Sequence, residues 1–249
     1  MQILKVVSRL LDYPVEEIRE YRADLALAIG SARELPPELR AALLDTLGAL
    51  CAGDLMDAQE AYGLLFDRGR SLSLHLFEHV HGESRDRGQA MVDLLDVYRS
   101  NGFELDAPEL PDYLPLFLEY LAGRPELEAR EWLADVAHIL GRIAFRLEER
   151  DQEGQRYAVL LKALLVIAGA SDQLAEARSA LAGERQDDHT PEAIDREWEE
   201  AAVTFTAADR SCGDRQPVAR DAATPLRWTE SAGRSATVIR PVQLGGSAS

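Results

Sequence analysis

The chain has 249 residues, 46% of them hydrophobic, with a formal net charge of −17 and a pI near 4.7. So acidic a chain is a poor partner for a nucleic-acid backbone or an anionic membrane, and a basic peptide or basic protein surface is its natural complement. The only two cysteines, Cys51 and Cys212, are far apart, so their number excludes a disulfide framework and a cysteine-based metal site.

Apolar residues recur at helical spacing along most of the chain, and Pro or Gly separates the segments. This pattern predicts helices at about 3–11, 15–30, 36–50, 57–68, 72–81, 90–98, 112–123, 126–149, 154–169 and 171–182. We therefore predict an all-α, single-domain helical bundle over 1–183. A linker with a short docked amphipathic helix should follow at 184–206. The aperiodic segment 207–249 should be disordered.

Segment 72–81 fits two patterns. Leu72, Leu74 and Leu76 alternate as in a strand, whereas Leu72, Leu76, Phe77 and Val80 fit a helix. We favour the helix, because the neighbouring segments are helical and a lone strand would have no partner.

Three features argue for a protein of the cytoplasm. The first residues lack the continuous apolar run of a signal peptide, and the most apolar later stretch, 158–170, is too short to span a bilayer. Cysteine usage is also that of a reducing compartment.

A histidine-rich stretch raises the question of a metal. A helix would place His75 and His79 on one face, and Glu78 with His81 has the Glu-x-x-His spacing of di-iron bundles. A helical-bundle metalloprotein using these four residues is thus the alternative function. The second Glu-x-x-His pair of such a site is missing, so hydrogen-bonded histidines at a bundle edge are the simpler interpretation.

An acidic, proline-bounded turn offers another kind of site. Glu109 and Asp112 precede the aromatic residues Tyr113, Phe117 and Tyr120. Acids and aromatics gathered at a helix entry suit a basic, partly apolar peptide. The residues leave a structural alternative equally open, with Asp112 as a helix N-cap and the aromatics in the core. We find no nucleophile motif and no glycine-rich phosphate loop, which argues against an enzyme.

Two of these segments resemble the paired signature of a known family. They are Tyr62-x-x-Leu65-Phe66 and Glu109-x-Pro111-Asp112, and longer matches cover 66–71, 76–94 and 110–116. In these residues the chain resembles the TorD/NarJ-like redox-enzyme maturation chaperones, and within them the delta-subunit type that assembles membrane-bound respiratory nitrate reductase. One position departs from the wider family, which often has a histidine where this chain has Tyr113. Any role of that histidine is therefore not carried over.

The resemblance implies a cytoplasmic, non-catalytic chaperone without a cofactor of its own. It would bind the apo catalytic (alpha) subunit of nitrate reductase, including an N-terminal peptide, and hold it for molybdenum cofactor insertion. It would not remain in the finished enzyme. Candidate partners also include the proteins that deliver the molybdenum cofactor, with no nucleic acid and no membrane insertion. The expected peptide-binding residues are Glu109, Asp112, Tyr113, Phe117, Tyr120, His75, Glu78, His79 and Arg85. A generic helical adaptor is a third interpretation.

Removal of the residues after Ala207 should leave the melting temperature nearly unchanged, because this segment has no apolar period with which to pack on a core. A thermal melt of the truncated chain beside the full chain checks this. A drop of many degrees would contradict it.

Overall fold

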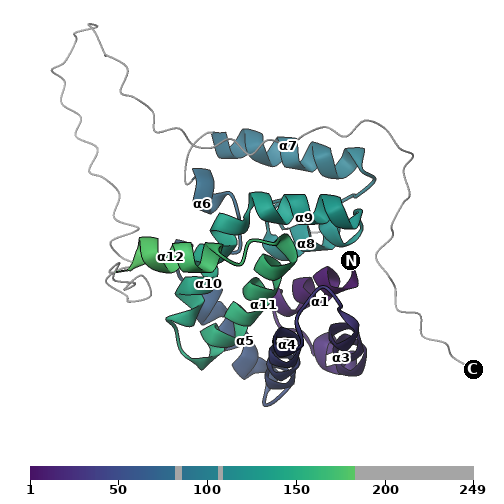
Figure 1. The fold of residues 1–249 in the computed structure, drawn as a ribbon, viewed down its shortest axis with the longest axis vertical. Helices are drawn as coiled ribbons and strands as arrows, with labels where there is room; N and C mark the ends of the chain where they lie inside the picture. Colours follow the sequence, from purple (N-terminus) through teal and green to yellow (C-terminus); the bar gives the residue numbers. More distant parts are fainter. Residues whose placement is uncertain (82–85, 106–108, 183–249) are drawn as a thin grey trace, which may run out of the picture.

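The computed structural model describes residues 1–81, 86–105 and 109–182, which consist mainly of helices (Figure 1). In chain order these are α1 (Gln2–Leu11), α2 (Glu16–Glu20), α3 (Arg22–Ser31), α4 (Pro37–Leu50), α5 (Leu55–Phe66), the 3-10 helix η1 (Arg70–Leu72), α6 (Glu78–His81), α7 (Asp86–Ser100), α8 (Leu114–Ala122), α9 (Glu126–Asp135), α10 (Ala137–Glu148), α11 (Gln152–Ala168) and α12 (Gln173–Leu181). The predicted all-α fold is confirmed. Across these ranges, no helix is both long and apolar enough to cross a membrane. The predictions for 184–206 and 207–249 lie outside the described residues.

Helix α11 forms the centre of the bundle. It packs against α10, α9, α4 and α1, while α12 covers α10. Figure 1 shows α7 along one side, beyond α8 and α9, with α1, α3 and α4 toward the opposite side. Apolar side chains from α1 to α11 join in one buried cluster. Burial of this apolar surface is the main favourable term in the stability of the fold.

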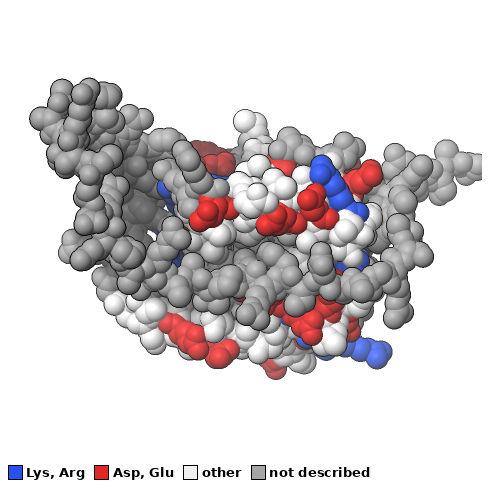
Figure 2. All heavy atoms as spheres, turned by 90° about the horizontal axis from the view of Figure 1, so that it is seen from above, with Lys and Arg blue, Asp and Glu red and all other residues white. Residues whose placement is uncertain are grey.

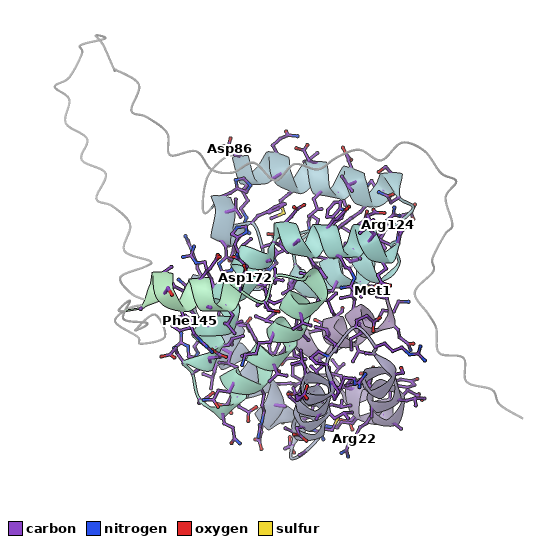
Figure 3. The ribbon with its side chains drawn as sticks, viewed as in Figure 1. Met1, Arg22, Asp86, Arg124, Phe145 and Asp172 are labelled. Carbon is purple, nitrogen blue, oxygen red and sulfur yellow. The ribbon has the colours of Figure 1, made fainter. Side chains whose placement is uncertain are left out.

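The first helix is fixed against a helix that lies far from it in the sequence. The Ser8 hydroxyl of α1 donates to the Pro115 carbonyl of α8 at 2.7 Å, and both groups are buried. The Met1 amino group donates to the Ala122 carbonyl at the other end of α8, at 2.8 Å. In Figure 3, Met1 lies on the same side of the molecule as Arg124, which follows α8. Contacts between α1 and α8 thus run along the whole of both helices.

The ends of the central helix follow from local sequence. Asp151 caps the start of α11, where its carboxylate accepts the Gly154 amide at 3.1 Å. Gly169 ends the helix in the left-handed conformation, with φ of 71°, and its amide bonds back to the last turn. A side chain at this position would strain the backbone, so glycine is the residue that the turn requires.

A second glycine permits a close approach between helices. A Cβ atom on Gly141 of α10 would lie 2.7 Å from the carbonyl oxygen of Gln173, at the start of α12. That distance is shorter than a van der Waals contact. The missing side chain therefore lets α12 lie directly on α10.

Two helices that we predicted as continuous are interrupted. The 15–30 helix divides at Tyr21 into α2 and α3, and the 126–149 helix divides at Val136 into α9 and α10. Tyr21 and Val136 have ψ angles of 15° and 2°, away from the helical value, although neither is Gly or Pro. Val136 is buried, so tertiary packing overrides its local tendency to continue a helix.

The predicted helix at 72–81 is wrong in its central part. η1 ends at Leu72, α6 begins at Glu78, and the residues between them are not helical. The reason for choosing a helix was that a strand would have no partner. The structure supplies one, because His75 forms an isolated antiparallel bridge with Tyr113.

Phe66→Ala should reduce the free energy of unfolding by about 3–5 kcal/mol, as truncation of a buried aromatic side chain does. Phe66 is 8% exposed, and its ring lies 4.7 Å from that of Tyr62 and 5.1 Å from that of Tyr157. Urea unfolding checks this. Leu64→Ala is the matched control, because Leu64 lies on the same helix and is 44% exposed. Equal losses in the two variants would mean that Phe66 contributes no more than a surface residue.

Candidate functional site

The antiparallel bridge joins two segments that sequence analysis had singled out separately. The Leu76 amide donates to the Asp112 carbonyl at 3.1 Å, and the Leu114 amide donates to the Leu74 carbonyl at 2.8 Å. These bonds pair backbone N–H and C=O groups of residues 74–76, which are not part of a helix. The histidine-rich stretch and the acidic turn therefore lie side by side and form one site.

Asp112 holds the bridge from inside. Its side chain is 0% exposed, and its two oxygens have different partners. Oδ2 accepts the Phe77 amide at 3.0 Å, and Oδ1 lies 3.2 Å from His75 Nδ1. A buried carboxylate needs such partners because desolvation is costly. Asp112 is not the N-cap of α8, so that part of the structural alternative is wrong: the N-cap is Tyr113, which makes no side-chain capping bond.

His75 bridges the buried carboxylate and the surface. The hydrogen bond to Asp112 raises the pKa of His75, partial burial opposes this, and the charges of Asp112 and Glu78 add to the rise. Its ring lies 5.4 Å from the Tyr113 ring, with a tilt of 38°. His75 can therefore carry a positive charge nearer to neutral pH than an ordinary histidine.

The other members of the histidine stretch point to separate partners. His79 Nε2 donates to the Ser73 carbonyl at 2.8 Å, and burial lowers the pKa of His79. Glu78 accepts from Arg87 of α7 at 3.1 Å, and His81 packs edge-on against Phe77. Within residues 1–81, 86–105 and 109–182, no three His, Cys, Asp or Glu side chains are grouped to hold a metal ion. Arg85 lies outside these ranges.

The aromatic residues of α8 lie below the turn rather than on its surface. Phe117 and Tyr120 are buried, and both pack against Trp132 of α9, with ring centroids 5.9 and 5.8 Å away. Burial raises the pKa of Tyr120 to about 12. Tyr98 of α7 packs on Tyr120 and donates its hydroxyl to the Pro111 carbonyl at 2.8 Å. These rings support the turn and offer no free surface to a ligand, in contrast to the exposed Glu109.

Three tyrosines form a cluster that sequence reasoning missed. Tyr13, Tyr62 and Tyr113 come from three separate parts of the chain, and we call them the tyrosine cluster. The Tyr62 hydroxyl lies 3.0 Å from the Tyr113 hydroxyl, and the Tyr113 hydroxyl donates to Asp12 Oδ1 at 3.1 Å. Tyr13 packs edge-on against Tyr62 at 5.5 Å. The available signal was the position of Tyr62 in the first segment of the family signature and of Tyr113 directly after the second.

Exposed members of these groups form one surface, which we call the acidic-aromatic face. It consists of Asp12, Tyr13, His75, Glu109, Leu110 and Tyr113. Tyr13 and Leu110 are 45% and 46% exposed, and Tyr113 and His75 are half-buried. Carboxylates beside flat apolar rings can bind a ligand that is both cationic and apolar.

Carboxylates are also spread over other parts of the surface. Figure 2 shows the side on which α7 lies, where several groups of Asp and Glu side chains are visible and few Lys or Arg. The acidic-aromatic face differs from this general acidity because aromatic rings accompany its carboxylates. The described residues thus combine an all-helical fold with a surface on which carboxylates accompany aromatic rings, and such a surface suits a ligand that is both cationic and apolar.

Comparison with known proteins assigns the family. Residues 32–153 match the family model described as nitrate reductase delta subunit. The chain is 50% identical over 214 residues to the nitrate reductase molybdenum cofactor assembly chaperone NarJ of Escherichia coli K12, covering 85% of this chain and 87% of that protein. It is 45% identical over 218 residues to the probable chaperone NarW of the same strain, covering 88% and 90% of the two chains. A probable NarJ of Bacillus subtilis is 33% identical over 162 residues, covering 64% and 84%. The chain therefore belongs to the NarJ family of nitrate reductase assembly chaperones. These three relatives are named as assembly chaperones.

The His75–Asp112 pair predicts a pH dependence of stability. Because the folded-state pKa of His75 is raised, its contribution is fully present below the unfolded-state value of about 6.5 and is lost as pH rises through the folded-state pKa. The free energy of unfolding of the wild type minus that of His75→Gln should therefore be larger at pH about 5.5 than at pH about 8.5. Denaturant unfolding of both proteins across this range measures it.

His79→Gln provides the opposite control. The pKa of His79 is lowered, so its contribution is present above the unfolded-state pKa and is lost as pH falls through the folded-state pKa. The free energy of unfolding of the wild type minus that of His79→Gln should therefore decrease as the pH is lowered. If the two differences changed with pH in the same direction, the hydrogen bond to Asp112 would not be what sets the protonation of His75.

Proposed function

We propose that this protein is a cytoplasmic chaperone for the apo catalytic (alpha) subunit of membrane-bound nitrate reductase. It binds the N-terminal peptide of that subunit at the acidic-aromatic face and holds the subunit until the molybdenum cofactor is inserted. It then leaves, and it is not part of the final enzyme. Family membership supports the class of client, because the curated relatives are named for molybdenum cofactor assembly of nitrate reductase.

The observation that carries the proposal is the composition of this face. Its exposed apolar side chains, Tyr13 and Leu110, each follow an acidic residue in the sequence, Asp12 and Glu109. Burial of these apolar side chains against a ligand would be favourable, because it removes apolar surface from water. A peptide with both a positive charge and apolar side chains is the ligand that covers the rings and pairs with the acids.

The residues proposed for the site have different roles. Glu109, Tyr113, His75 and Glu78 are accessible enough to contact the peptide. Asp112, Phe117, Tyr120 and His79 act through them, because their side chains hold the bridge and the turn in place. Arg85 remains a proposed contact on the basis of its position in the family match.

Proteins that deliver the molybdenum cofactor are proposed as a second class of partner, which would meet the chaperone while the client is bound. The metalloprotein alternative receives no support from the geometry, since Asp112, Ser73 and Arg87 engage His75, His79 and Glu78 separately. Capture of the alpha subunit from a lysate by the tagged chaperone, with release after cofactor insertion, tests the main proposal. Retention of the client regardless of its cofactor content would contradict the holding role.

Glu109→Gln should leave the fold intact and weaken binding of the peptide by about two- to fivefold, because the variant loses an exposed charge. The binding should also depend less on salt, since the lost attraction is the part that salt screens. Calorimetric titration at two salt concentrations measures both. An unchanged affinity and salt slope would remove Glu109 from the site.

Asp112→Asn provides the contrasting variant. Its carboxylate is buried, so the change should lower the free energy of unfolding by about 1.5–3 kcal/mol, as loss of hydrogen bonds to a charged group does. Binding by the folded fraction should fall less than in Glu109→Gln. A normal melting temperature with a large loss of affinity would mean that Asp112 contacts the peptide directly.

A further inference from the structure

Four oxygen atoms form a continuous row through the tyrosine cluster. The row begins at the Leu11 carbonyl, which lies 3.0 Å from the Tyr62 hydroxyl, and the Tyr113 hydroxyl follows at 3.0 Å. It ends at Asp12 Oδ1, 3.1 Å from the Tyr113 hydroxyl. Asp12 Oδ1 also accepts the Tyr13 amide at 2.9 Å. Every contact in the row has the length of a hydrogen bond between oxygens or slightly more.

The row contains fewer hydrogens than contacts. A backbone carbonyl and an ionised carboxylate supply none, and each phenol supplies one. Burial raises the pKa of both Tyr62 and Tyr113 above the ordinary value, so both phenols keep their hydrogens near neutral pH. Two hydrogens therefore serve three contacts, and one contact always lacks a hydrogen.

Two arrangements of these hydrogens keep the Leu11 carbonyl paired with Tyr62. In the first, Tyr113 donates to Asp12 and the two phenol oxygens have no hydrogen between them. In the second, Tyr113 donates to Tyr62, and the Asp12 carboxylate loses that donor. Rotation of one hydroxyl group interconverts them without moving a heavier atom. The first arrangement is favoured when no peptide is bound, because a hydrogen bond to a charged acceptor is stronger than one to a neutral acceptor.

We infer that Asp12 accepts a cationic side chain of the bound peptide, and that Tyr113 releases the carboxylate by turning its hydrogen to Tyr62. This inference rests on the proposed peptide-binding function and adds a residue that sequence analysis did not select. It identifies the feature that is recognised: an Arg or Lys whose charge reaches Asp12 while its aliphatic stem lies along the Tyr13 ring.

The surroundings of Asp12 favour a cation. The side chain is 39% exposed and follows the last residue of α1, where the partial negative charge of the helix C-terminus adds to that of the carboxylate. Arg9 is the nearby cation, with Nη1 3.9 Å from Asp12 Oδ2, beyond the length of a charge-assisted hydrogen bond. The Arg9 side chain is mostly exposed, so the carboxylate is open to a closer partner.

Two peptides and two matched variants test the charge contact. The probes are the N-terminal peptide of the catalytic subunit and a neutral twin, in which citrulline replaces each Arg and norleucine each Lys. Asp12→Asn should weaken binding of the charged peptide by about three- to tenfold, the range of a partly exposed charged hydrogen bond, and should leave the twin unaffected. The control Asp172→Asn removes the same charge from an exposed residue before α12, which packs on α10. It should bind both peptides like the wild type.

The hydroxyl rotation gives two tyrosine variants opposite effects. Tyr113→Phe keeps the ring that contacts the peptide and removes only the hydroxyl that competes for the carboxylate, so the charged peptide should bind with higher affinity. Tyr62→Phe removes the alternative acceptor, so Tyr113 keeps its bond to Asp12 and affinity should fall by about threefold, a fraction of a charged hydrogen bond. Titrations are corrected for the folded fraction from thermal melts. Should Tyr62→Phe fail to fold, the comparison of the affinities of Tyr113→Phe and Asp12→Asn for the charged peptide still tests the inference.

The possible results separate the two levels of the argument. If the wild type binds neither peptide, the proposed function fails and the inference fails with it. If the wild type binds the charged peptide and Asp12→Asn binds it equally well, the inference alone is overturned. Loss of affinity in Tyr113→Phe as large as in Asp12→Asn would mean that the hydroxyl itself contacts the peptide, which overturns the rotation.

Discussion

The geometry of the site depends on a single buried carboxylate. Asp112 has no exposed surface, and its two oxygens bind the Phe77 amide and the His75 ring. These two residues precede it in the sequence by 35 and 37 positions. Removal of a carboxylate from water is unfavourable unless its partners are in place, so this group allows few alternative positions for the chain around it. The position of Tyr113, which follows Asp112 directly, is a consequence of that constraint.

The sequence predicted the helices well because their signals are local. The apolar period of α11, its Asp151 cap and its Gly169 end are all present within the segment itself. The extended stretch before α6 could not be predicted in this way, because its partner lies at Tyr113. The alternation of Leu72, Leu74 and Leu76 fits a strand, but it decides nothing against a helix unless that partner is known. The breaks at Tyr21 and Val136 were not predictable either, since no Gly or Pro marks them.

The site was predictable in its location but less so in the roles of its residues. The two family segments do meet in space, and Glu109 is exposed beside them. Helical spacing could not show which face of α8 turns inward, and Phe117 and Tyr120 prove to be buried. Asp12 carried no signal, because an acidic residue after an amphipathic helix is common in a chain of this composition. Its significance appears only when Tyr62 and Tyr113 are placed beside it.

The bonds between α1 and α8 have a consequence for synthesis of the chain on the ribosome. The Ser8 hydroxyl meets its acceptor only after a further 107 residues have been added. At common translation rates this takes about 5 to 20 seconds. During that interval the apolar stripe of α1, with Leu4, Val7 and Leu11 fully buried in the final fold, has no helix α8 to cover it. This member of a chaperone family is thus synthesised with an apolar helix that stays uncovered by α8 until late in translation, and its fold is completed only then.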